Sequence, residues 1–147
     1  MFRLLFSLSL AVYGPAVRHE KECMKILYVD DSPFTRKLMK KSLEQGKHET
    51  REATNGQEAL DLLRQELPDL LLTDLLMHGI SGKELLRTVH GLYPHLPIIV
   101  VSADAQESTL TECLALGAKA LFPKGGLYTN AKEFMDLLER IGASNNT

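Results

Sequence analysis

The chain has 147 residues, of which 44% are hydrophobic, and this suits one globular domain with an ordinary buried core. Its 17 basic and 19 acidic residues nearly cancel, and no basic block or basic helical face indicates a nucleic-acid partner. Cys23 and Cys113 form no C-x-x-C or Cys/His metal motif. We expect Cys113 to be a core residue of a helix and Cys23 to be a free thiol, with no dependence on a disulfide.

The first 23 residues differ from the rest of the chain. An apolar run from Leu4 to Tyr13 follows an early arginine and resembles a weak secretory signal peptide. The run is too short to span a bilayer, which takes roughly 20 apolar residues. The alternative, which we favour, is that translation starts at Met24, where a strand pattern opens directly. We expect a domain over residues 24–142 and a frayed tail over residues 143–147.

From Met24 onward, apolar runs of strand length alternate with stretches of helical period. Two of the runs, LLLT and IIVV, are apolar on both faces, as in central strands of a parallel sheet, whereas residues 48–53 are polar enough for an edge. The predicted strands are residues 25–29, 48–53, 70–73, 98–101 and 118–122.

Helix-start signals support this alternation. Ser32 is a natural N-cap, and Pro33 suits the first helical position because its missing N–H has no partner there. The helix that follows is predicted to place Phe34, Leu38, Met39 and Leu43 on one face. Capping-box spacing, or a close variant of it, marks the other helix starts at Asn55 with Glu58, Ser81 with Glu84, Asp104 with Glu107, and Asn130 with Glu133.

Strand–helix–strand units of this kind form right-handed crossovers onto one parallel sheet. The predicted fold is therefore α/β, a flavodoxin-like, doubly wound (βα)5 sheet with strand order 2-1-3-4-5. Such a sheet has its binding crevice at the carboxyl ends of strands 1 and 3.

Three carboxylates fall at those strand ends: Asp30 and Asp31 after the first strand, and Asp74 after the third. Carboxylates brought together repel one another, so a divalent cation is the expected neutraliser, and hard oxygen ligands suit Mg²⁺. Each aspartate alone could instead be a helix cap or a solvated turn residue. The adjacent pair together with Asp74 favours the metal site.

Two further residues fall at the same end of the sheet. Ser102 closes the fourth strand and Lys124 follows the fifth. A hydroxyl and an ammonium facing a metal-bound carboxylate are what a phosphoryl group needs, because its oxygens can be shared among them while a carboxylate attacks in line.

Several stretches of the chain, in this order and spacing, resemble the receiver domain of two-component response regulators. They cover about residues 24–142 and read ILYVDDSPFTRKLM, EATNGQEAL, DLLLTDLLMHGISGKELL, IIVVSA and GAKALFPKG. In length the match most resembles single-domain regulators of the chemotaxis type, with no output domain.

The resemblance implies a role for each site residue. Asp74 would be the phosphoacceptor, Asp31 a direct Mg²⁺ ligand, and Asp30 a residue that positions the metal, mainly through water. The backbone carbonyl of Leu76 would be a further ligand. Ser102 and Lys124 would bind the phosphoryl oxygens, and Leu121 would occupy the switch position three residues before the lysine.

The resemblance also implies partners and a location. The phosphoryl donor would be a sensor histidine kinase or a histidine phosphotransfer protein in the cytoplasm, and the output would be altered affinity for a downstream target protein. We expect no nucleic-acid or membrane partner and a monomer or weak dimer. We expect no enzyme activity beyond the protein's own phosphorylation and dephosphorylation.

Three positions depart from the family pattern. His78 and Gly125 stand where the family usually has proline, and Leu121 stands where it usually has the aromatic switch residue. Phe122 could replace that aromatic only by a register slip, which would turn it to the other face. We interpret His78 as an exposed loop residue, although a metal-binding or proton-transfer role is the alternative. Leu76 is predicted to shield the phosphoaspartate from water, and Asp104 lies at the other position that tunes its access.

Two other functions are compatible with parts of the pattern. A docking module that needs no phosphorylation would keep the fold, and the changes at Gly125 and Leu121 favour it slightly. A small phosphatase with an aspartate nucleophile fits less well, because haloacid-dehalogenase-type enzymes space two aspartates two residues apart. A flavin-binding flavodoxin lacks support, since the first loop has no Ser/Thr/Gly-rich phosphate cradle.

Overall fold

The structure, a computed structural model, describes residues 23–145. The expectations for residues 1–22 and for residues 146 and 147 therefore lie outside the described residues. Within the described range, both cysteines are free and Cys113 is buried, as predicted, and Cys23 is exposed.

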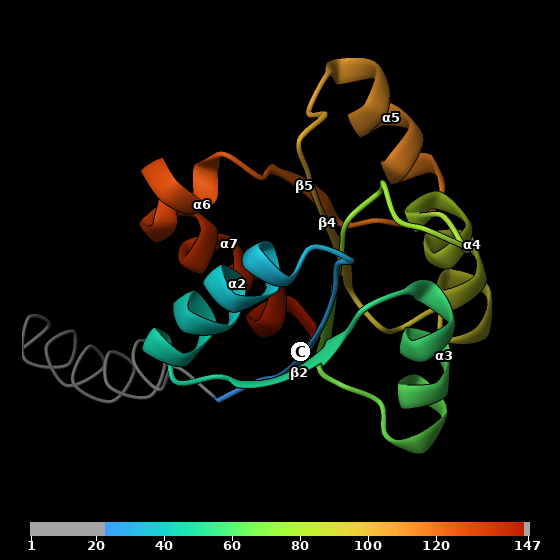
Figure 1. The fold of residues 1–147 in the computed structure, drawn as a ribbon, viewed down its shortest axis with the longest axis horizontal. Helices are drawn as coiled ribbons and strands as arrows, with labels where there is room; N and C mark the ends of the chain where they lie inside the picture. Colours follow the sequence, from blue (N-terminus) through green and yellow to red (C-terminus); the bar gives the residue numbers. More distant parts are fainter. Residues whose placement is uncertain (1–22, 146–147) are drawn as a thin grey trace, which may run out of the picture.

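The centre of the molecule is a parallel sheet of five strands in the order β2-β1-β3-β4-β5, which confirms the predicted topology (Figure 1). The polar strand β2 lies at an edge, and the apolar strands β3 and β4 lie inside the sheet. The strands are β1 (Lys25–Val29), β2 (Glu49–Ala53), β3 (Leu70–Thr73), β4 (Ile98–Ser102) and β5 (Ala120–Pro123).

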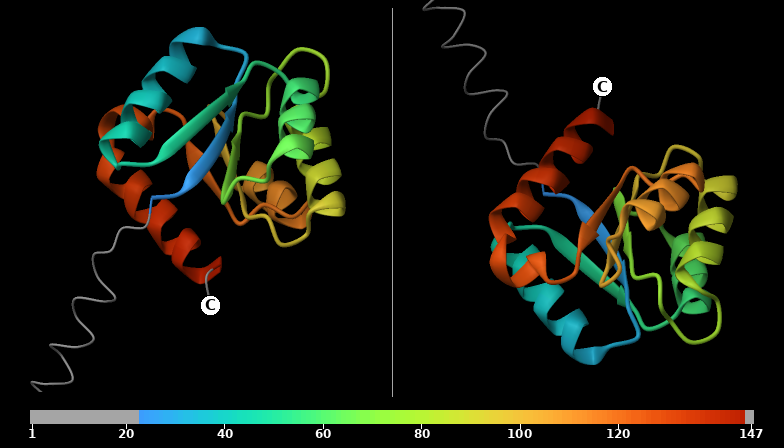
Figure 2. Two further views of the ribbon diagram at one scale, coloured as in Figure 1. Left: turned by 90° about the horizontal axis from the view of Figure 1, so that it is seen from below. Right: turned by 90° about the horizontal axis from the view of Figure 1, so that it is seen from above.

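Helices cover both faces of the sheet, as the figures show from three directions (Figures 1 and 2). One layer holds α2 (Pro33–Gln45), α6 (Gly126–Thr129) and α7 (Ala131–Asn145). The other holds α3 (Gly56–Gln65), α4 (Gly82–Leu92) and α5 (Glu107–Ala115).

Each face of the sheet has its own hydrophobic core, because successive residues of a strand point to opposite sides. In β1, Leu27 and Val29 pack in the core under α3, α4 and α5, whereas Ile26 and Tyr28 pack in the core under α2 and α7. Burying one such side chain contributes about 1.5–3 kcal/mol. The strand that carries two of the site aspartates is thus fixed from both sides.

Most predicted helix starts are found where expected. Ser32 accepts a bond from the Thr35 N–H, and Ser81 with Glu84 forms a complete capping box. Asn55 caps α3 by accepting from the Glu58 N–H.

The start of α5 differs from the prediction. The helix begins at Glu107 with Gln106 as its N-cap, and Asp104 lies before it. The Asp104 carboxylate instead accepts bonds from the Gln106 N–H and the Thr109 hydroxyl, so it stabilises the loop that leads into the helix.

The predicted buried face of α2 is wrong at one position. Phe34 is 67% exposed, and the buried residues step by four along the helix as Thr35, Met39 and Leu43. Phe34 lies in the first turn of the helix, and Leu38, four residues further on, is partly buried against the core.

The chain after β5 also departs from the simple alternation. The short helix α6, which the sequence pattern does not indicate, separates Lys124 from α7. A side chain on Gly126 would collide with the Phe122 ring, so this turn packs tightly against β5. Helix α7 runs to Asn145, and Gly142 within it packs closely against the Met24 side chain.

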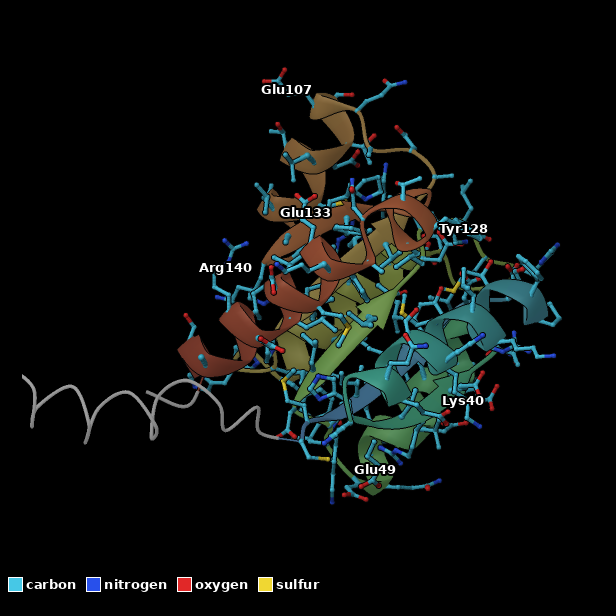
Figure 3. The ribbon with its side chains drawn as sticks, turned by 90° about the vertical axis from the view of Figure 1, so that its left-hand side faces the viewer. Lys40, Glu49, Glu107, Tyr128, Glu133 and Arg140 are labelled. Carbon is cyan, nitrogen blue, oxygen red and sulfur yellow. The ribbon has the colours of Figure 1, made fainter. Side chains whose placement is uncertain are left out.

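The outer surface of the α2 and α7 layer carries charged side chains (Figure 3). Lys40 of α2 and Glu133 and Arg140 of α7 are exposed there, and Tyr128 of α6 is 58% exposed. Over residues 23–145, the helices are too short or too polar to cross a bilayer.

Candidate functional site

The carboxyl ends of the strands bring together four of the predicted site residues. Oxygen atoms of Asp30, Asp31 and Asp74 lie within 4.8 Å of one another. The Lys124 Nζ lies 2.8 Å from Asp30 Oδ2 and 2.9 Å from Asp74 Oδ2. One ammonium therefore bridges carboxylates that come from the first and third strands.

Asp30 is fully buried, and protein donors hold both of its oxygens. The Tyr28 hydroxyl donates to Oδ2 at 2.7 Å, and the Ser32 N–H donates to Oδ1 at 2.8 Å. With Lys124 also on Oδ2, little of this carboxylate is left to bind an ion directly. This arrangement suits the indirect role that the sequence predicts for Asp30.

Sequence reasoning missed Tyr28. Its ring lies in the core under α2 and α7, and burial, the largest cause, together with the bond to Asp30, raises the pKa of its hydroxyl far above the ordinary value. The phenol therefore stays protonated and donates. A hydroxyl-bearing aromatic two residues before the first aspartate was the available signal, since residues two apart in a strand share a face.

Asp74 is almost buried, with 5% of its surface exposed. The Leu75 N–H donates to Oδ1 at 2.7 Å, and Lys124 donates to Oδ2. Helix α4 begins directly against this loop, because a side chain on Gly82 would overlap the backbone of Asp74 and Leu75. Burial raises the pKa of Asp74, and the Asp30 charge adds to this, while Lys124 opposes it without cancelling it.

Lys124 keeps its charge in this setting. Burial works to lower the pKa of its ammonium, but the bonds to Asp30 and Asp74 outweigh it and raise the pKa above the ordinary lysine value. The backbone N–H of Lys124 donates to the Ser102 carbonyl at 2.8 Å. The ends of β4 and β5 are tied together at the site.

Asp31 is the most accessible of the three aspartates, with 28% of its side chain exposed. Its Oδ2 lies 2.8 Å from the Nδ1 of His78 and accepts a hydrogen bond from the backbone N–H of His78 at 3.3 Å. The side-chain bond to His78 is the main reason that the pKa of Asp31 lies below its usual range. His78 is 99% exposed, as expected of a loop residue, but its contact with Asp31 was not predicted.

The remaining predicted residues lie around this cluster. Ser102 is buried at the end of β4, and its hydroxyl accepts a bond from the Asp104 N–H at 3.1 Å. Leu76 is 73% exposed and lines an open hollow together with Ala103, Asp104, Ala105 and Gln106.

The register of β5 decides which side chain occupies the switch position. Leu121 pairs with Val100 and is partly buried against the core under α3, α4 and α5. Phe122 is buried in the other core, with its ring centroid 4.9 Å from that of Phe134. Phe122 therefore does not replace Leu121.

The charges of the cluster suit a divalent cation. Three carboxylates and one ammonium leave two negative charges at the mouth of the site. Hard carboxylate and carbonyl oxygens are ligands that Mg²⁺ accepts, together with several waters. Asp31 and Asp74, with the Leu76 carbonyl two residues further on, are the residues that could hold it.

The comparisons with known proteins agree with this geometry. The family model of the response regulator receiver domain matches residues 26–136. This chain belongs to the response regulator receiver family.

Curated relatives of this receiver include signalling proteins of similar length. The chemotaxis protein CheY of Thermotoga maritima is 32% identical over 101 residues, which are 68% of this chain and 84% of CheY. The sporulation initiation phosphotransferase F of Bacillus subtilis is 33% identical over 100 residues, which are 68% of this chain and 81% of that protein.

Solved structures of receivers share the fold. A CheY-like receiver from Methanospirillum hungatei has a TM-score of 0.77 at 26% identity, covering 85% of this chain and 98% of that one. The response regulator TrrA from Thermotoga maritima was solved in complex with Mg²⁺ and BeF. It has a TM-score of 0.72 at 29% identity, covering 80% of this chain and 97% of TrrA.

Proposed function

We propose that this receiver accepts a phosphoryl group on Asp74 with the help of Mg²⁺ and signals by a change in its affinity for a partner protein. The observation that carries the proposal is the ammonium of Lys124, which bridges Asp30 and Asp74 beside the third carboxylate, Asp31. The phosphodonor is a histidine kinase or a histidine phosphotransfer protein in the cytoplasm. The receiver catalyses no reaction beyond its own phosphorylation and dephosphorylation.

The transfer uses the Asp74 carboxylate as the nucleophile. An Asp74 oxygen forms a bond to phosphorus while the bond from phosphorus to the donor's imidazole nitrogen breaks, and the imidazole keeps that electron pair. Lys124 lies 2.9 Å from Asp74 Oδ2, so its ammonium can follow the charge onto a phosphoryl oxygen. The Leu75 N–H holds Oδ1 in a fixed direction during this step.

The fit of the site to Mg²⁺ rests on the donor set, and Mg²⁺ when bound would neutralise charge on the phosphoryl oxygens. Asp31 and Asp74 would hold Mg²⁺, with the Leu76 carbonyl as a further ligand. Asp30 would position the ion indirectly, mainly through water. TrrA, which has the same fold, was solved with Mg²⁺ and BeF. This similarity supports the assignment of the metal.

The output step uses the loop between β4 and α5. The Ser102 hydroxyl, which now accepts from the Asp104 N–H, would donate to a phosphoryl oxygen and draw this loop inward. A shift from 1:99 to 99:1 between two arrangements takes about 5.5 kcal/mol. Hydrogen bonds to charged groups contribute about 1.5–3 kcal/mol each, so a few of them suffice. The surface that changes is formed by α5, β5 and α7.

One observation favours a second candidate, a docking module that works without phosphorylation. Leu121 is aliphatic and partly buried, so it lacks the ring whose rotation would transmit the signal. The intact arrangement of Asp30, Asp74 and Lys124 supports the first function over this one. A phosphatase has less support, because Asp30 and Asp31 are adjacent rather than two residues apart.

The test is chemical phosphorylation followed by intact mass spectrometry. The protein is incubated with acetyl phosphate and Mg²⁺, with parallel samples in EDTA and with the Asp74→Asn variant. We expect one phosphoryl adduct that needs the metal and disappears in the variant. An adduct that persists in Asp74→Asn, or the absence of any adduct on the wild-type protein, would overturn the proposal, and the second result would favour the docking module. Continuous release of phosphate from several phosphomonoesters would point to the phosphatase instead.

A further inference from the structure

The contact between His78 and Asp31 has no counterpart in the usual family sequence, where proline stands at this position. His78 approaches one carboxylate oxygen with two groups at once. Its Nδ1 lies 2.8 Å from Asp31 Oδ2, and its backbone N–H donates to the same oxygen at 3.3 Å. A proline here would have neither the ring nor the N–H. A proline would therefore remove both contacts, and the contact through the ring needs the imidazole of histidine.

The loop after β3 aims His78 at the site. Met77, just before it, packs partly buried against the core under α3, α4 and α5. Gly79, just after it, has a φ of +79°, in the left-handed region that glycine adopts without a steric penalty. In this loop His78 reaches Asp31, which lies just after β1.

The direction of the hydrogen bond between His78 and Asp31 follows from the carboxylate. An ionised carboxylate can only accept hydrogen bonds, so the Nδ1 of His78 is the nitrogen that donates to Asp31. Because both donors engage Oδ2, the other oxygen of Asp31 stays available. A side chain held by one oxygen offers the second to a metal ion from a fixed direction.

His78 itself lies outside the cluster of possible ligands. The group of described residues whose oxygen or nitrogen atoms lie close enough to share an ion contains Asp30, Asp31 and Asp74 but not His78. This placement favours an indirect role. Residues that hydrogen-bond to a metal ligand orient it, and their loss commonly weakens metal binding by about 10–100-fold.

We infer that His78 is a positioning residue of the divalent-cation site, which holds Asp31 through Oδ2 and so presents its other oxygen to the ion. The inference rests on the proposed function, since it assigns a role at the same metal site. It concerns affinity for the cation, not the identity of the phosphoacceptor. The imidazole is otherwise fully exposed, so we expect an effect near the lower end of the range, about tenfold.

The test measures cation binding without phosphorylation. Mn²⁺ replaces Mg²⁺, and the free ion is counted by electron paramagnetic resonance at one fixed pH for all variants. The variants are His78→Ala, His78→Asn, whose amide N–H can take the place of Nδ1–H, and His78→Pro. The matched control is His95→Ala, since His95 is also exposed but precedes β4, at the opposite end of the sheet.

We expect His78→Ala to weaken Mn²⁺ binding about tenfold and His78→Pro to weaken it at least as much, while His78→Asn and His95→Ala stay within about threefold of the wild-type protein. Equal or tighter binding by His78→Ala, or failure of His78→Asn to restore affinity, would overturn the positioning role. Nitrogen hyperfine coupling from a directly bound histidine on Mn²⁺ would also overturn it, by placing His78 on the metal.

The outcomes separate this inference from the proposed function. If the wild-type protein binds Mn²⁺ and forms the Asp74 adduct but His78→Ala binds equally well, only the role of His78 is rejected. If the wild-type protein binds no cation, the metal site and the role of His78 are rejected together.

Discussion

Replacing Lys124 with methionine would remove the only positive side chain that contacts both Asp30 and Asp74 among the described residues, and would leave those two carboxylates side by side. Asp30 is fully buried and the Asp74 side chain is 8% exposed, so water cannot take over the role of the ammonium. Breaking a buried ion pair by removing one partner costs about 3–5 kcal/mol. Since the Lys124 side chain is 21% exposed, we expect the lower end, about 3 kcal/mol.

The measurement is urea unfolding in EDTA. Far-UV circular dichroism monitors the unfolding, because the chain contains no tryptophan whose fluorescence could report it. The control is Lys119→Met, which removes an exposed lysine just before β5 and should change the free energy of unfolding by less than about 0.5 kcal/mol. Saturating Mg²⁺ should reduce the difference in the free energy of unfolding between Lys124→Met and the wild-type protein, because the ion neutralises charges that the variant leaves uncompensated.

A second substitution tests the electrostatic cause. Asp74→Asn in the Lys124→Met background removes one of the two uncompensated charges, so it should recover part of the lost stability. A loss below about 1 kcal/mol in EDTA for Lys124→Met, or no recovery in the double variant, would refute the reasoning from buried charge.

Three further predictions follow from the geometry. Leu76→Asn should speed hydrolysis of the proposed acyl phosphate about tenfold, equivalent to a barrier lower by ~1.4 kcal/mol, because a polar side chain in that exposed position can hold the attacking water. If the phosphoryl adduct seen by mass spectrometry decays at an unchanged rate, the shielding role of Leu76 is contradicted. Without metal, Asp74→Asn should stabilise the fold at neutral pH, because burial raises the pKa of Asp74 and the ionised carboxylate is disfavoured in the folded state. This gain in the free energy of unfolding should shrink as the pH falls through the raised pKa and vanish below the ordinary value of 3.8. A gain that is the same at every pH would be inconsistent with this cause. Gly126→Ala should destabilise the fold by about 1–3 kcal/mol, because the added methyl group would collide with the Phe122 ring. Gly125 faces open space at a φ of −61°, so Gly125→Ala should be neutral or slightly stabilising. Equal midpoints of urea unfolding for the two variants would contradict the packing argument.

The strand order and the convergence of the site could be predicted because both follow from rules that need only patterns. Two strands apolar on both faces must lie inside a covered parallel sheet, and right-handed crossovers leave few ways to connect five such strands. Once the order is known, Asp30, Asp74 and Lys124 must meet, since each directly follows a strand. No contact between particular side chains is needed for this conclusion.

The contacts that the prediction missed depend on single dihedral angles and on side-chain reach. The bond from His78 to Asp31 forms in a loop with a left-handed residue at Gly79, and the sequence pattern does not determine that dihedral angle. The exposure of Phe34 depends on where α2 starts relative to the sheet, and one residue of offset moves a side chain by about 100° around a helix.

The length of α6 was equally hidden, because GGLYTN reads as a loop by composition. Its packing against Phe122 depends on the absence of a side chain at Gly126, which is a property of the folded chain.

The phenol of Tyr28 gives this protein an internal reporter. Its ring is completely enclosed and its hydroxyl contacts Asp30, whereas Tyr93 and Tyr128 keep part of their surface in water. With no tryptophan to mask it, a change of charge at the site should alter the ultraviolet absorption or the carbon-13 resonance of this one ring. Ion binding and the proposed phosphorylation could then be followed in the unlabelled or tyrosine-labelled chain, without a dye attached to its surface.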